Sequence, residues 1–276
     1  MMPPLEFLEE VAREAGEILM RHHGRLSRVD KKGARDLVTE ADREAERHIL
    51  ARIRDRFPGD GIIAEESLPE SRRAHRLWII DPLDGTTNFV YRIPHFAVSI
   101  AFYLEGRPLL GCVFNPRLDE CFTAARGGGA HKNGGRISCN RTTRLSEALL
   151  ATGFAYRREE RADSNLQHFV DMVLLARGLR RLGSAALDLC YVAEGVLDGF
   201  WELHLSAWDV AAGALIAAEA GALVTDFDGE GEWLFGGRIV AAPAELSAEI
   251  RRVLLAADPR DLPGPLYRPQ RRLLEE

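Results

Sequence analysis

The spacing of apolar and polar residues near the start of the chain is typical of two helices. Apolar residues recur at helical intervals over Leu5–Met20, which predicts the first helix. A second helix is predicted over Thr39–Phe57, because Thr39 can cap its first turn and Pro58 follows its end. The stretch between them, Gly24–Asp36, is polar and contains glycine, which predicts a mobile loop.

Short apolar runs separated by turn residues follow the second helix, and they predict antiparallel strands. Two glycine-rich segments, Gly127–Gly129 and Gly134–Gly135, are interpreted as hairpin turns, since neither has the G-K-[ST] sequence and following helix of a nucleotide-binding loop. The runs predicted as strands are Gly61–Ala64, Leu77–Ile80, Phe96–Leu104, Leu109–Phe114 and Glu120–Ala124.

The second half of the chain alternates strands with helices, which predicts layered α and β structure whose first sheet has meander-type pairing. No internal repeat or long linker is visible, so we expect a single domain over residues 1–276, with possible subdomains 1–145 and 146–276. The tail after Asp258 is rich in Pro and Arg and is expected to be loosely held. The predicted elements are strands over Ala148–Thr152, Gly199–Leu203 and Leu223–Asp226, and helices over Asn165–Ala176, Ser184–Glu194, Asp209–Gly221 and after Pro243.

Composition narrows the class of protein. With 276 residues and 46% hydrophobic content, the chain can bury a large core, so disorder is not expected. The formal net charge of -6 gives no general electrostatic reason to bind nucleic acid or an anionic membrane, and neither is expected as a partner.

Cysteine usage and hydropathy bear on the compartment. The four cysteines form no C-x-x-C pair, so we expect neither a zinc knuckle nor a disulfide framework, and a reducing cytoplasm fits best. The acidic N-terminal segment lacks the basic start and apolar run of a signal peptide. The longest apolar stretch, Val210–Ala218, lies between Asp209 and Glu219 and is too short to span a bilayer. The protein is therefore expected to be soluble and cytoplasmic.

The segment Leu77–Asn88 carries the clearest chemical signal. An apolar run ends in Asp81, Pro82 prevents further strand pairing, and Asp84 with Gly85 turns the chain so that two acids can converge. Converging carboxylates repel each other unless cations lie between them, and hard oxygen ligands select Mg²⁺ or Mn²⁺. The motif D-P-x-D alone is equally compatible with a surface turn.

Two further acidic segments make a metal site more specific. Ala64–Ser67 places Glu65 and Glu66 just past an apolar run, and Trp208–Gly213 places Asp209 at the start of a helix rich in small residues. Taken singly, the glutamates could form a solvated turn and Asp209 could be an ordinary helix cap. Together with the first segment they indicate a multi-metal site.

These three segments resemble the signatures of the inositol monophosphatase family, which are G/A-E-E-S, W-I-x-D-P-[IL]-D-G-T-x-N-F and W-D-x-A-A-G. The resemblance extends from about Leu5 to Pro243. It implies a Mg²⁺-dependent, Li⁺-sensitive phosphomonoesterase, with two or three Mg²⁺ per site and Mn²⁺ as a substitute. It also implies a homodimer and the layered αβαβα sandwich of the inositol monophosphatase and fructose-1,6-bisphosphatase type. The metal ligands that it implies are Glu65, Asp81, the backbone carbonyl of Leu83, Asp84 and Asp209.

The resemblance also assigns catalytic roles. Glu65 would act through the first metal, while Asp42 and Thr86 would hold the attacking water and help to deprotonate it. Asp42 could instead be a first-turn helix acid, favoured there by the helix dipole. A loop lysine closes over the site in the family, and Lys31, Lys32 or neither could take that role here.

Substrate contacts follow from the same comparison of motifs. Backbone N–H groups and hydroxyls of Gly85, Thr86 and Thr87 would bind phosphate, as expected of a helix N-terminus. Glu202, seven residues before Asp209, would accept hydrogen bonds from the hydroxyls of a small phosphorylated polyol. A second substrate-contacting element would be Gly183, Ser184 and Ala185, with Asp209 also close to the substrate, although Ser184 could equally be a helix N-cap.

Three functions remain open at this point. The first is hydrolysis of inositol monophosphate to inositol and phosphate by metal-activated water. The second is a sibling specificity, for fructose 1,6-bisphosphate, histidinol phosphate or 3′-phosphoadenosine 5′-phosphate. The third is a non-catalytic regulatory protein on the same fold. The chain has no G-x-S-x-G motif, which disfavours a serine hydrolase.

Overall fold

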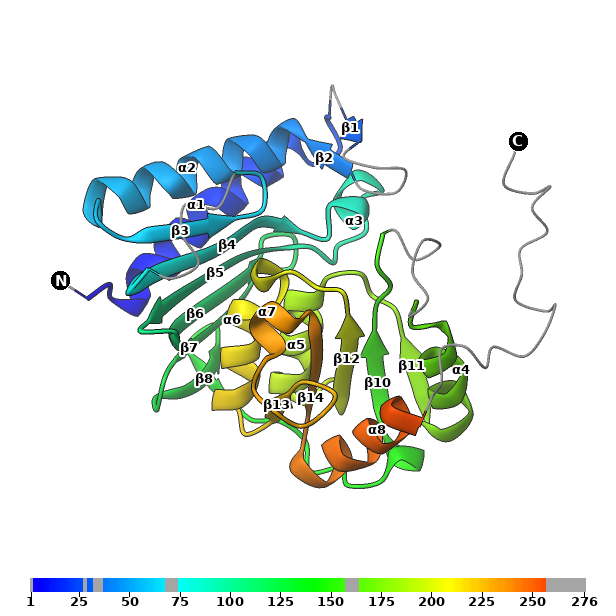
Figure 1. Ribbon diagram of the computed structural model, residues 1–276. Coiled ribbons are helices and arrows are strands. Elements are labelled where there is room, and N and C mark those ends of the chain that lie inside the picture. Colours follow the sequence, from blue (N-terminus) through cyan, green and yellow to red (C-terminus); the bar gives the residue numbers. More distant parts are fainter. Residues whose placement is uncertain (1, 27–28, 32–36, 68–73, 157–163, 257–276) are drawn as a thin grey trace.

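The computed structural model describes residues 2–26, 29–31, 37–67, 74–156 and 164–256. Two β-sheets and three groups of helices alternate as layers (Figure 1). This αβαβα order confirms the predicted layered fold. The outer layer on the first sheet is α1 (Leu5–His22) and α2 (Glu40–Arg56), the central layer is α5 (Ala185–Glu194) and α6 (Ala207–Glu219), and the outer layer on the second sheet is α4 (Leu166–Leu175) and α8 (Ala244–Ala256).

The first sheet is a meander with one added strand. From β4 to β9 each strand pairs antiparallel with the next, whereas β3 pairs parallel with β4. The prediction that the run Gly61–Ala64 is antiparallel is therefore wrong, because β3 and β4 start at the same end of the sheet. The strands are β3 (Gly61–Ala64), β4 (Arg76–Asp84), β5 (Ala97–Leu104), β6 (Arg107–Asn115), β7 (Glu120–Ala125), β8 (Gly129–Lys132) and β9 (Gly135–Ile137).

The glycine segments lie where hairpin turns were predicted. Gly127, between β7 and β8, and Gly129, the first residue of β8, have positive φ, and so does Gly134 between β8 and β9. Part of the predicted loop Gly24–Asp36 forms a strand instead, since β1 (Val29–Lys31) pairs antiparallel with β2 (Leu37–Thr39). The side chains of Lys31 and Lys32 lie outside the described residues.

The second sheet mixes parallel and antiparallel strands in the order β11-β10-β12-β14-β13. β10 pairs parallel with β11 and with β12. β14 pairs antiparallel with β12 and with β13. β14 and the three-residue strand β11 were not predicted from the sequence. The strands are β10 (Leu149–Thr152), β11 (Gly178–Arg180), β12 (Gly199–Leu203), β13 (Leu223–Thr225) and β14 (Arg238–Ala242), and the remaining short helices are α3 (Thr86–Val90), a 3₁₀ turn (Leu145–Glu147) and α7 (Trp233–Gly236).

Small residues hold the central helices close to their neighbours. A Cβ on Gly111 of β6 would lie 3.0 Å from the carbonyl oxygen of Ala212 in α6. A Cβ on Gly213 of α6 would lie 2.8 Å from the Cβ of Leu189 in α5. Substitution at either position would therefore push α6 away from the first sheet or from α5. Among the described helices, none combines the length and the apolar character needed to cross a membrane.

Candidate metal centre and active site

The end of β4 brings two carboxylates to the same place. Its pairing with β5 is regular up to Asp81, and the register then shifts before Asp84, which pairs with Ala97. The prediction that Pro82 prevents further strand pairing is therefore wrong, because a bulge accommodates the proline and the strand resumes. Pro82 lies within this irregular stretch, as expected of a residue without an N–H group. The N–H of Leu83 donates to Oδ1 of Asp81 at 2.9 Å, which fixes the buried Asp81 side chain.

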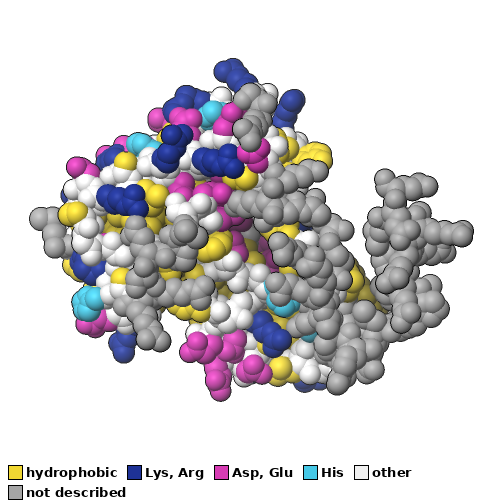
Figure 2. Space-filling view, turned by 45° about the horizontal axis from the view of Figure 1, so that its top comes forward, with side chains coloured by type: hydrophobic (Ala, Val, Ile, Leu, Met, Phe, Trp, Pro, Cys, Tyr) yellow, Lys and Arg dark blue, Asp and Glu magenta, His cyan; other side chains and the backbone are white. Residues whose placement is uncertain are grey.

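Asp209 joins them from the first turn of α6. Carboxylate oxygens of Asp81, Asp84 and Asp209 all lie within 4.8 Å of one another. Oδ2 of Asp209 also accepts a hydrogen bond from the N–H of Ser206 at 2.6 Å, so Asp209 is the N3 residue of a capping box whose N-cap is Ser206. The two interpretations of Asp209 are therefore compatible. Figure 2 shows acidic side chains gathered near the centre of this face of the molecule.

The electrostatics of this cluster favour a bound cation. Burial, reinforced by the nearby carboxylates of Glu65, Asp84 and Asp209, raises the pKa of Asp81 well above its ordinary value. Burial also raises the pKa of Asp84 to about 6. Anionic oxygens that repel one another in a buried place are hard ligands, and a divalent cation such as Mg²⁺ relieves their repulsion. The donor set therefore fits Mg²⁺.

Thr86 and Asp42 meet beside this cluster. The Thr86 hydroxyl lies 3.1 Å from Oδ1 of Asp42 and 3.0 Å from the carbonyl oxygen of Leu83. Oδ2 of Asp42 accepts hydrogen bonds from the N–H of Thr39 at 2.9 Å and from its hydroxyl at 2.5 Å, which caps α2. Asp42 is thus both a first-turn helix acid and a partner of Thr86. Its burial raises its pKa to about 6.

Gly85 is required by close packing at the start of α3. Its φ is 91°, and a Cβ there would lie 3.0 Å from the carbonyl oxygen of His95 and 3.3 Å from that of Gly183. Asn88 bridges the same segments, since its Nδ2 donates to the carbonyls of His95 at 2.7 Å and Leu182 at 2.8 Å. Gly85 and Thr86 are buried, whereas Thr87 is partly exposed.

The start of α5 holds Asp84. The Ser184 hydroxyl donates to Oδ2 of Asp84 at 2.6 Å, and the N–H of Ala186 donates to the same oxygen at 2.8 Å. The Ser184 oxygen also accepts from the N–H of Leu187 at 3.3 Å, so Ser184 is the N-cap of α5. The cap interpretation of Ser184 is confirmed, and a contact with substrate stays a prediction.

A cavity of about 190 Å³ opens beside the carboxylates. Glu202 lies in its wall at the end of β12, and a Cβ on Gly153 would lie only 2.2 Å from the Glu202 carboxylate oxygens. Burial, followed by the charges of Asp188 and Asp209, raises the pKa of Glu202 well above its ordinary value. The site residues named from sequence that line the cavity are Glu65, Asp84, Gly183, Ser184, Ala185, Glu202 and Asp209.

Sequence reasoning missed several residues of the site. Asp188 and Arg181 line the cavity, and His95 lies against Asp188. The available signal was Asp188 itself, because a lone acid within the apolar helix Ala185–Ala193 needs a buried partner. His95 carries no such signal, since it follows a proline in an ordinary loop.

A layered αβαβα fold with a carboxylate cluster beside the central helical layer defines the inositol monophosphatase class of fold. The chain belongs to the inositol monophosphatase family, whose model matches residues 2–257. It is 47% identical over 248 residues to the Nus factor SuhB of Pseudomonas aeruginosa, covering 87% of this chain and 92% of that one. It is 41% identical over 256 residues to an inositol-1-monophosphatase of Mesorhizobium japonicum, covering 92% and 95%. The solved inositol monophosphatase from Anabaena superimposes with a TM-score of 0.85 at 40% identity, covering 92% and 96%.

Proposed function

We propose that this protein is a Mg²⁺-dependent phosphomonoesterase that hydrolyses inositol monophosphate to inositol and phosphate. The observation that carries this proposal is the cluster of Asp81, Asp84 and Asp209, with one oxygen of each within 4.8 Å of the others, beside a cavity that Glu202 also lines. The inositol-1-monophosphatase of Mesorhizobium japonicum, at 41% identity, supports the same activity.

Five groups would hold the metal, namely the carboxylates of Glu65, Asp81, Asp84 and Asp209 and the carbonyl of Leu83. Mg²⁺ supplies Lewis acidity, which lowers the pKa of a water and neutralises charge on the phosphate and the leaving alkoxide. The chain's contribution is to keep these oxygens convergent, through the bonds from Leu83 to Asp81 and from α5 to Asp84. Two or three ions per site, and replacement by Mn²⁺, are part of the proposal.

Thr86 and Asp42 would handle the proton of the attacking water. The Thr86 hydroxyl donates to Asp42 in this role, which leaves its oxygen free to accept a hydrogen bond from water. A carboxylate whose pKa is about 6 is basic enough to accept a proton near neutral pH. Backbone N–H groups at Gly85, Thr86 and Thr87 would bind the phosphate oxygens.

Glu202 and the segment Gly183–Ala185 would bind the alcohol part of the substrate. A buried carboxylate that accepts hydrogen bonds from two neighbouring hydroxyls favours a polyol over an alcohol without them. Asp209 is close enough to this wall of the cavity to contact the same hydroxyls. These contacts would select among substrates and would take no part in the phosphoryl chemistry.

A phosphate-release screen tests the proposal. The purified protein is assayed with and without Mg²⁺ on inositol 1-phosphate, fructose 1,6-bisphosphate, histidinol phosphate and 3′-phosphoadenosine 5′-phosphate. We expect Mg²⁺-dependent release that is fastest from inositol 1-phosphate, and a loss of several orders of magnitude in the Asp209→Asn variant. Faster release from one of the other three substrates would assign a sibling specificity. No release from any of them would refute catalysis.

A second candidate function is that of a Nus factor, because the Pseudomonas aeruginosa relative with 47% identity has that name. The two functions can be separated by replacing that relative in its own organism with this chain, either unchanged or as Asp84→Asn. Rescue by both forms would support a Nus factor role that is independent of catalysis. Rescue by the unchanged form alone would tie the role to the metal site, and rescue by neither would remove this candidate.

A further inference from the structure

His95 and Asp188 are neighbouring buried side chains that have no part in the chemistry above. His95 is 8% exposed and Asp188 is 1% exposed, and Nε2 of His95 lies 3.5 Å from Oδ1 of Asp188. Neither of these two atoms has a hydrogen-bond partner among the described residues. A buried carboxylate oxygen and a buried ring nitrogen without other partners are stabilised chiefly by each other.

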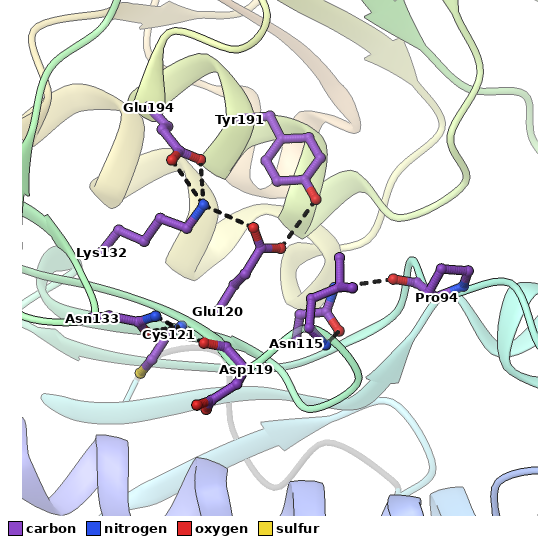
Figure 3. A network of polar contacts seen from close by, with 10 residues as sticks. Pro94, Asn115, Asp119, Glu120, Cys121, Lys132, Asn133, Tyr191 and Glu194 are labelled. Atoms are coloured by element: carbon purple, nitrogen blue, oxygen red, sulfur yellow. Dashed lines mark hydrogen bonds and ion pairs between the residues drawn. The ribbon is translucent and has the colours of Figure 1, made fainter.

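The backbone of His95 is fixed by its own surroundings. Nδ2 of the buried Asn115 donates to the carbonyl of Pro94 at 3.2 Å, and Nδ2 of Asn88 donates to the carbonyl of His95. The His95 ring lies 5.5 Å from the Tyr191 ring, measured between centroids. The Tyr191 hydroxyl donates to Glu120 at 3.1 Å, as Figure 3 shows together with the bond from Asn115 to Pro94. The His95 side chain is therefore held against α5.

The pair joins the two segments that surround Asp84. Asp188 lies one helical turn beyond Ser184 on α5, and Ser184 and Ala186 are the groups that donate to Asp84. The carbonyl of His95 lies against Gly85, the residue that follows Asp84. A contact between His95 and Asp188 therefore ties the start of α5 to the backbone beside Asp84.

We propose that His95 and Asp188 form a positioning pair for Asp84. The pair holds the N-terminal turn of α5 at the distance from Gly85 that keeps the Asp84 carboxylate next to Asp81 and Asp209. This inference rests on the proposed function, because it concerns the geometry of the metal site. Neither residue needs to touch the metal or the substrate to exert the effect.

A purely electrostatic role would have a different signature. The Asp188 carboxyl group is close enough to act electrostatically on Asp84 and Glu202, and the His95 ring is close enough to act on Asp84 and Asp188. Removing a negative charge near the site weakens cation binding, whereas removing an imidazole that can be positive strengthens it or leaves it unchanged. If the two residues act through their mutual contact, substitution of either one weakens cation binding. Substitution of both then weakens cation binding no more than substitution of one.

The test is a titration of the metal-free full-length protein with Mn²⁺, in which free Mn²⁺ is followed by electron paramagnetic resonance. The proteins are the unchanged chain, His95→Phe, Asp188→Asn, the double variant and, as a test of the metal site itself, Asp84→Asn. His95→Phe keeps a ring against Tyr191 and removes the nitrogen that faces Asp188. We expect each variant to bind Mn²⁺ about 10-fold more weakly, as is typical for residues that orient metal ligands, and the double variant to match the single ones.

Matched controls separate positioning from general stability. His168→Phe and Asp198→Asn make the same chemical changes at buried sites outside the cavity, where His168 contacts the carbonyl of Leu254 and Asp198 accepts from Asn140 and Thr142. We expect both controls to lower the melting temperature and to leave the Mn²⁺ affinity unchanged. If Asp188→Asn does not fold, the comparison of His95→Phe with His168→Phe decides alone.

Each remaining outcome has one meaning. Opposite effects of His95→Phe and Asp188→Asn, additive effects in the double variant, or unchanged affinity in His95→Phe would overturn the positioning pair. Failure of the unchanged chain to bind Mn²⁺, or full binding by Asp84→Asn, would instead refute the metal site on which the proposed function depends. The two failures are therefore distinguishable in one series of titrations.

Discussion

The substitution Asp84→Asn should stabilise the metal-free protein while it removes activity. Oδ2 of Asp84 accepts hydrogen bonds from Ser184 and Ala186, and an asparagine oxygen can accept both. The substitution therefore keeps these contacts and removes only the negative charge. The new amide group would also face the carboxylates of Asp81 and Asp209, to which it can donate.

The magnitude follows from the pKa of Asp84. Burial raises that pKa from 3.8 to about 6 in the folded protein. At about 1.4 kcal/mol for each pKa unit, ionised Asp84 lowers the free energy of unfolding at pH 7 by about 3 kcal/mol. Because the folded pKa is the higher one, this loss is absent below about pH 3.8, develops as the pH rises and is complete above about pH 6.

Urea unfolding of both proteins in EDTA at a series of pH values measures the difference. The variant should be more stable by about 3 kcal/mol at pH 7, and the difference should shrink as the pH falls toward 4. Added Mg²⁺ should stabilise the unchanged chain and not the variant, since only the former binds it tightly. A variant that is less stable than the unchanged chain at pH 7, or a difference that does not depend on pH, would refute this reasoning.

Three further outcomes are expected. Glu202→Gln should lower kcat/KM for inositol 1-phosphate by about one to two orders of magnitude, because charge-assisted hydrogen bonds to hydroxyls are lost. It should spare an aryl phosphate, and an equal loss on both substrates would mean that Glu202 supports the fold or the metals. Gly85→Ala should lower the free energy of unfolding by about 1–3 kcal/mol or more in urea titrations, since φ there is 91°; unchanged stability would contradict the close packing. Li⁺ should inhibit phosphate release more than Na⁺ at equal concentration, and equal inhibition would separate this site from the family's pattern.

The convergence of the acidic residues could be predicted from the sequence, because the motifs that contain them are local. Their roles as metal ligands stay a prediction. Pro82 lies in the irregular stretch of β4 between Asp81 and Asp84, and Gly85 follows the end of the strand. The two carboxylates come together there. The role of Asp209 was harder to predict from the sequence. An acid in the first turn of a helix is compatible with both a capping role and metal binding. The structure shows why both were plausible, as one carboxylate oxygen caps α6 and the acid also faces Asp81 and Asp84.

Long-range arrangement was not readable from the residues alone. Periodicity predicts that Gly61–Ala64 is a strand but carries no information on its direction, so its parallel pairing with β4 was missed. The order of the layers came from the family resemblance and not from spacing. His95 and Asp188 lie on segments far apart in the chain, and nothing local to either one identifies the other.

Small residues set how closely the central helix α6 packs against the first sheet and against α5. Gly111 and Gly213 leave α6 no room for even one extra methyl group, against β6 on one side and α5 on the other. Asp209 is carried by α6, whereas Asp81 and Asp84 are carried by β4. The distance between the Asp209 carboxylate and the carboxylates of Asp81 and Asp84 therefore depends on helix packing away from the site. Changes at these glycine positions would retune the preference between Mg²⁺ and the larger Mn²⁺ without altering a single ligand.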